Sequence, residues 1–269
     1  MKGICNKALK YIITAFATPG LCGMLATASR AQGVATGLVN IGTPGIVAPQ
    51  QLGFRADARV FGGDENTTYG GAGIRYGLAA NWELGVGASL AQFENFSLPG
   101  GGIVRHGGTD LEISAKYAVK QSYKSATSAQ VGVGLPNTPA QTSAHLTLGL
   151  AGSLNVGSGV DLYLNPRAAL ITDNSIIGLG IGAKIKLARQ TFLIGDYTPI
   201  LTGANTIDVN TGTQRSRDIY GAAIRFALGG GAASIDVGWT NGTGFTTGSS
   251  LTPGLGNSSA FYVTLNLKR

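Results

Sequence analysis

The chain has 269 residues, of which 43 are glycine and only 12% are charged. Its formal net charge of +7 falls to +3 without the four bases of residues 1–31, because 16 basic and 13 acidic residues then remain. So small an excess does not indicate nucleic-acid binding. The length allows one sizeable domain, and no apolar run after residue 31 is long enough for a membrane helix.

Residues 1–31 have the pattern of a secretory signal peptide: three lysines, then a mostly apolar stretch of small residues. Small residues precede the expected cleavage after Ala31, with Ala28 as the second possible site. A membrane anchor is the alternative, but the stretch is short and interrupted by proline and glycine. A lipoprotein would need another residue than Leu21 before Cys22. Both cysteines lie in this segment, so the remaining 238 residues can form no disulfide and no thiolate metal site.

The segment FRADARV, residues 54–60, charges every second residue and keeps the others apolar. Successive side chains of a strand point to opposite faces, so this strand would have one apolar and one charged face. A soluble antiparallel sheet would turn the apolar face inward, and a membrane barrel would turn it outward. The remaining segments have to distinguish the two.

The same period of two predicts twelve strands of about ten residues. Their ranges are 54–60, 69–79, 82–92, 109–120, 129–135, 146–154, 160–167, 177–187, 191–201, 220–226, 233–239 and 261–268. The ninth is the exception, because Phe192, Leu193 and Ile194 break the alternation and leave its faces unassigned. Short connections follow the even-numbered strands, and most connections after the odd-numbered strands are longer.

Short turns on one side and long loops on the other are typical of outer-membrane barrels. Aromatic residues near the strand ends suit the two membrane interfaces. We therefore predict an all-β fold, a closed antiparallel up-and-down transmembrane β-barrel of about twelve strands over residues 52–269, in place of a secreted soluble β-protein. Residues 32–51 are apolar, rich in glycine and without a clear strand, and they either plug the barrel or lie in the periplasm.

Residues 52–269 resemble, by this pattern, Gram-negative outer-membrane β-barrel proteins of the porin-like kind. Residues 237–241, Val-Gly-Trp-Thr-Asn, followed by Thr246 and Thr247, look like the penultimate strand of a family of uncharacterised bacterial barrels. The resemblance implies the class and not a substrate. One departure is the end Leu267-Lys268-Arg269, because such barrels commonly end in an aromatic residue that the insertion machinery reads.

No catalytic site, metal site or cofactor is predicted, and we expect the protein not to be an enzyme. Ser143 and His145 share one strand face, a weak likeness to a membrane phospholipase, but this face points to the lumen and lipid could not reach it. His106 has no second ligand nearby. Gly178, Gly180 and Gly182 alternate within a strand, which favours small lumen residues over a phosphate-binding loop.

The charged face predicts the residues that line the pore. They are Arg55, Asp57, Arg59, Arg75, Glu83, Asp110, Glu112, Lys116, Asp161, Arg167, Lys184, Lys186, Arg225 and Asp236. Either they pair and stiffen a closed interior, or they line a water-filled passage and set its ion preference. The many inward glycines favour a passive pore for small hydrophilic solutes. Lys184 and Lys186, with Arg55 and Arg59, suggest a mild anion preference.

The alternative function is a non-conducting barrel with a structural or adhesive role through its outer loops. The expected location is the bacterial outer membrane, after secretion across the inner membrane. The expected partners are outer-membrane lipid, small hydrophilic solutes or ions, the barrel-insertion machinery and further copies of the chain in a homo-oligomer, with no nucleic acid.

Overall fold

The computed structural model describes residues 37–62, 67–97, 103–137, 144–172, 174–208, 211–254 and 258–269. The predicted signal peptide lies outside these ranges. No helix in the described ranges is long and apolar enough to cross a membrane.

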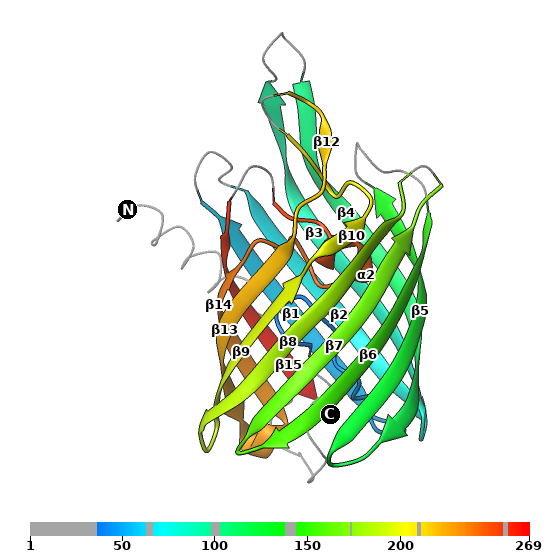
Figure 1. Ribbon diagram of the computed structural model, residues 1–269, viewed down its shortest axis with the longest axis vertical. Coiled ribbons are helices and arrows are strands. Elements are labelled where there is room, and N and C mark those ends of the chain that lie inside the picture. Colours follow the sequence, from blue (N-terminus) through cyan, green and yellow to red (C-terminus); the bar gives the residue numbers. More distant parts are fainter. Residues whose placement is uncertain are drawn as a thin grey trace.

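The fold is a closed antiparallel barrel of twelve strands, which confirms the predicted architecture (Figure 1). The wall strands are β1 (Leu52–Phe61), β2 (Thr68–Ala79), β3 (Trp82–Ser97), β4 (Ile103–Gln121), β5 (Ser125–Asn137), β6 (His145–Gly157), β7 (Val160–Leu170), β8 (Ile176–Ala188), β9 (Thr191–Thr198), β13 (Ile219–Leu228), β14 (Ala233–Thr240) and β15 (Ala260–Lys268). Each pairs with its neighbours along the chain, and β1 pairs with β15 to close the barrel.

Of the smaller elements, all but α2 lie at the two ends of the barrel. The short strand β10 (Ile200–Thr202) prolongs β9 along β8 and shifts register between Ile200 and Thr202, and β11 (Thr206–Ile207) pairs with β12 (Gln214–Arg215) in a separate hairpin. The 3₁₀ turn η2 (Gly229–Gly231) joins β13 to β14, and α2 (Thr247–Ser250) lies between β14 and β15. We call the end with the short connections and the C-terminus the turn end, and the opposite end the loop end (Figure 1).

The burial of alternating side chains shows which face of each strand points into the barrel and which points outward. In β1, Asp57 and Arg59 are buried inside the barrel, whereas large apolar side chains cover its outer surface. Ile74, Leu84 and Val86, for example, are 44–50% exposed. An apolar exterior over a charged interior is the reverse of a soluble sheet, and it is the arrangement of a barrel that spans lipid.

Aromatic pairs mark both ends of this apolar exterior. Trp82 and Tyr117 stand side by side at the turn end, with ring centroids 4.9 Å apart. Trp239 and Phe261 meet edge-to-face at the loop end, with centroids 6.0 Å apart. Aromatic rings prefer the two interfacial zones of a membrane, so the pairs delimit the band that would face hydrocarbon.

The ninth strand follows the same alternation, but its inner face is partly apolar. Ile194, Asp196 and Thr198 are buried, whereas Leu193 and Tyr197 are exposed. The inward Ile194 explains why the sequence pattern broke at this strand, because it packs on an apolar segment inside the barrel.

Candidate pore interior

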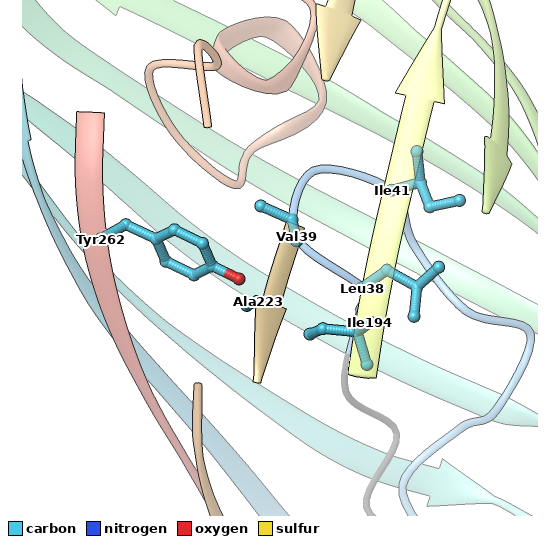
Figure 2. Close-up of a cluster of buried hydrophobic side chains, with 6 residues drawn as sticks. All are labelled: Leu38, Val39, Ile41, Ile194, Ala223 and Tyr262. Carbon is cyan, nitrogen blue, oxygen red and sulfur yellow. The ribbon is translucent and has the colours of Figure 1, made fainter. Parts of the chain in front are cut away.

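Residues 37–51, which we call the inner segment, lie inside the barrel as far as residue 48, and Pro49 and Gln50 are exposed. Leu38, Val39 and Ile41 are at most 1% exposed and form a cluster with Ile194, Ala223 and Tyr262 of the wall (Figure 2). A short turn, closed by the Leu38 N–H donating to the Ile41 carbonyl at 2.9 Å, presents these side chains. Burial of such apolar surface holds the segment against β9, β13 and β15.

Two wall glycines provide the space for this cluster. A Cβ at Gly182 would lie 2.4 Å from Cδ1 of Leu38, and one at Gly221 would lie 2.4 Å from Cγ1 of Val39. Such distances are too short for any larger residue without displacement of the inner segment. The inward glycines that the sequence pattern places in these strands therefore accept packed side chains here.

Asn40 anchors the tip of the inner segment to four strands. Its backbone N–H and side-chain Nδ2 donate to the two carboxylate oxygens of Asp196, at 2.7 and 2.9 Å. Its Oδ1 accepts from Nη1 of Arg59 at 3.1 Å and from the Thr240 hydroxyl at 2.9 Å. Its carbonyl accepts from Arg167. These buried bonds to charged groups fix the tip in one position.

The returning part of the inner segment crosses to the opposite wall. Nζ of Lys116 donates to the carbonyls of Thr43 and Gly45, at 2.6 and 2.7 Å. The Val47 N–H donates to Oε2 of Glu83 at 2.7 Å. The segment thus runs across the bore from β9 and β13 to β3 and β4.

Residues 241–254, which we call the inward loop, also fold into the bore. The N–H groups of Thr247 and Ser249 donate to Glu112 and Asp110 on β4, at 2.8 and 3.1 Å. Arg167 on β7 donates to the Ser250 hydroxyl at 2.8 Å. This connection was expected to be one of the long outer loops, and the polar interior draws it inward because carboxylates of the wall accept its backbone N–H groups.

An aromatic side chain of the inward loop occupies a further glycine-lined space. A Cβ at Gly71 would lie 2.6 Å from the Phe245 ring, and Gly73 and Gly87 face the same ring. The Arg55 guanidinium carbon lies 5.2 Å from the ring centroid, within range of a cation–π contact. The loop and the inner segment also meet, because Nη1 of Arg59 donates to the Gly242 carbonyl at 2.6 Å as well as to Asn40.

The structure places the predicted pore-lining residues as follows. Eight are buried: Asp57, Arg59, Glu83, Glu112, Lys116, Arg167, Arg225 and Asp236. Five are half-buried: Arg55, Arg75, Asp110, Asp161 and Lys184. Lys186 is exposed at the turn end.

Several of these charges are compensated by a partner. Arg59 pairs with Asp57, Arg225 with Asp236 and Lys184 with Asp161, each at 2.7 Å, and Arg75 lies 3.5 Å from Glu83. Arg59 and Asp57 share one strand, whereas the other pairs depend on the register between strands. The role of these residues in conduction stays a prediction.

One acid of the interior was absent from the predicted set. Asp196 is buried and holds Asn40, yet it lies on the strand whose faces the sequence pattern left unassigned. The spacing of Asp196, two residues after Ile194, could have identified it. Residues two apart on a strand point to the same face, and here that face is the inner one.

A cavity of about 100 Å³ remains between the two internal segments and the wall. Seven charged residues belong to its lining: Arg55, Arg75, Lys116, Arg167, Lys268, Glu83 and Glu112. We call it the chamber. Lys184 and Lys186 do not line it.

Of the two histidines, only the side chain of His145 belongs to the described part of the chain. His145 is buried, and neither ring nitrogen has a hydrogen-bond partner among the described residues. Ser143 and the side chain of His106 lie outside the described part of the chain. Within the described ranges, no three His, Cys, Asp or Glu residues are close enough together to hold a metal ion.

Comparison with solved structures identifies the fold. A KdgM porin matches with a TM-score of 0.51 at 11% identity, over 81% of this chain and 98% of the other. A NanC porin matches with a TM-score of 0.54 at 6% identity, over 80% and 98%. The chain has the fold of outer-membrane porins. No family model and no curated protein sequence matches this porin-like barrel.

Proposed function

We propose that this porin-like barrel sits in the bacterial outer membrane and passes small hydrophilic solutes passively. The observation that carries the proposal is a closed barrel with an apolar exterior and a charged, glycine-lined interior that keeps a chamber at its centre. An interior of this polarity in a membrane protein provides a route for water-soluble molecules.

The charge of the chamber supports the mild anion preference. Five bases and two acids belong to its lining, an excess of three positive charges. Both acids also accept backbone N–H groups, from Val47 and from Thr247. The bases Lys116 and Arg167 bond to carbonyl and hydroxyl oxygens, so their charge is not cancelled by those bonds.

The size of the chamber sets a condition on passage. About 100 Å³ holds only a few water molecules. A sugar or amino acid can cross only when the inner segment or the inward loop shifts. The polar contacts of the inward loop and of the returning part of the inner segment are the ones that such a shift would break.

The direct test is swelling of liposomes that contain the purified protein, in isotonic solutions of solutes of graded size. We expect swelling that falls steeply with solute size and is faster for small anions than for neutral solutes of equal size. Swelling no faster than in liposomes without protein, with insertion verified, would remove the pore function.

The filled bore favours a second candidate, a non-conducting barrel that acts through its outer loops. Strands β3 and β4, of 16 and 19 residues, are the longest of the wall and rise above the rim at the loop end (Figure 1). A structural or adhesive role would use this projection, and it predicts no swelling with any solute.

A further inference from the structure

The turn end of the barrel exposes bases and no acid among the described residues. Lys120 is the last residue but one of β4, Lys124 lies in the turn that follows, and Lys186 and Arg189 flank the end of β8. Arg269 is the last residue of the chain. All five residues are exposed.

The two acids near this end face the interior and are occupied there. Glu83 is 3% exposed and accepts the Val47 N–H. Asp161 binds Lys184 at 2.7 Å and accepts from Nδ2 of Asn155 at 2.7 Å. Neither acid is available to neutralise the bases of the rim, and the α-carboxylate of Arg269 offsets one of them, so the rim keeps a net positive charge.

Four of the five bases lie along one stretch of the rim, and Arg269, after β15, lies apart from them. The Asn155 N–H donates to the Lys124 carbonyl at 2.8 Å, which places the β4–β5 turn beside the β6–β7 turn. The Lys186 N–H donates to the Gly159 carbonyl at 2.8 Å, which places the β8–β9 turn on the other side of it. The rim charge thus lies on the two turns that flank the β6–β7 turn and is not confined to a single hairpin.

The depth of the bases matches that of lipid headgroups. Trp82 and Tyr117 mark the membrane interface at this end, and Lys120 lies three residues beyond Tyr117 on the same strand. Val119, next to Lys120, is 60% exposed on the apolar exterior, and a shift in register after Ala118 brings Lys120 opposite the exposed Thr127 of β5. A long basic side chain beside such residues reaches from the hydrocarbon edge to the phosphate level.

We infer that the turn end is a binding surface for the headgroups of anionic phospholipids. Anionic headgroups attract bases that lie close to the membrane surface, and a rim without exposed acids offers no repulsion against them. The inference rests on the membrane placement given under the proposed function, but not on conduction. It assigns a lipid class to the leaflet at the turn end, which is the leaflet that contains the short connections.

The two tryptophans of the chain provide the test, because one lies at each end. A Trp239→Phe variant keeps only Trp82, at the turn end, and a Trp82→Phe variant keeps only Trp239, at the loop end. Each is reconstituted in vesicles that contain either brominated phosphatidylglycerol or brominated phosphatidylcholine, both of which quench nearby tryptophan. The ratio of quenching gives the relative affinity for the anionic lipid next to each ring.

We expect phosphatidylglycerol to be preferred at Trp82, roughly fivefold for each base close to the ring, and less so at high salt. Adding Lys120→Gln and Lys124→Gln should abolish the preference, whereas Trp239 should show none. Equal quenching by both lipids at Trp82, or a preference that survives loss of the two lysines, would overturn the inference. Absence of quenching of either tryptophan by either lipid would instead refute the membrane placement.

Discussion

Replacement of Asn40 by alanine tests how firmly the inner segment is held. The substitution removes the Nδ2 bond to Asp196 at 2.9 Å and the bonds that Oδ1 accepts from Arg59 and Thr240, at 3.1 and 2.9 Å. The backbone bonds of residue 40 to Asp196 and Arg167 remain. The variant therefore weakens the docked state without deleting the segment.

The expected magnitude follows from the charge of the partners. Two of the three lost bonds involve a charged group, and such bonds contribute about 1.5–3 kcal/mol each. Water that enters the interior replaces part of the lost hydrogen bonding, so we expect the docked state of the inner segment to lose about 3 kcal/mol of stability. Each 1.4 kcal/mol is a factor of ten, so the undocked population should rise about 150-fold.

Thiol labelling measures that population. In a Val39→Cys background the cysteine replaces a side chain that is fully buried, and both natural cysteines lie in the predicted signal peptide. The rate of modification by a small water-soluble thiol reagent then reports undocking, as exchange rates report local opening. Asn174→Ala is the matched control, because this asparagine bonds only to Ala204 at the loop end among the described contacts. A rate for Asn40→Ala no higher than for this control would refute the role of Asn40.

Three further predictions test other parts of the interior. Asp110→Ala removes the carboxylate that accepts the Ser249 N–H, so we expect chymotrypsin to cleave the inward loop at Phe245 about tenfold faster. An unchanged cleavage rate would argue against this contact as the anchor of the inward loop. Gly221→Val places a side chain where Val39 lies, so the labelling rate of the Val39→Cys variant should rise sharply while the barrel keeps its heat-modifiable mobility in gels. Replacing Lys184 and Lys186 by glutamate should move the reversal potential in a salt gradient toward cations, and an unchanged value would remove the claim that these two lysines contribute to anion preference.

The wall of the barrel could be predicted from the sequence because the pattern that specifies each strand lies within that strand. Each strand repeats with a period of two, and the lengths of the connections separate the two ends. The pattern failed only where the interior is apolar: Ile194 faces inward because Leu38 and Val39 pack on it. The assignment of such a strand requires knowledge of what lies inside the barrel.

The contents of the bore depend on contacts between segments far apart in the sequence, and no local pattern encodes them. Asn40 meets Asp196, 156 residues away, and Thr247 meets Glu112, 135 residues away. The ion pair of Arg225 with Asp236 likewise depends on the register of β13 against β14. The sequence pattern left a plug and a periplasmic segment both open, and the small residues opposite Leu38 and Val39 could be interpreted only with the fold in hand.

The central claim is a solute route through a bore that the inner segment narrows, and single-channel conductance in planar bilayers tests it most directly. The protein is compared with a variant in which residues 37–47 are replaced by a glycine–serine sequence of equal length. We predict small or infrequent steps for the natural sequence and larger, longer-lived steps for the variant, because loss of the Leu38–Ile41 cluster frees the bore. Equal steps in both would contradict the assigned place of the inner segment in the conducting path, and silence in both, with insertion confirmed, would contradict the pore itself.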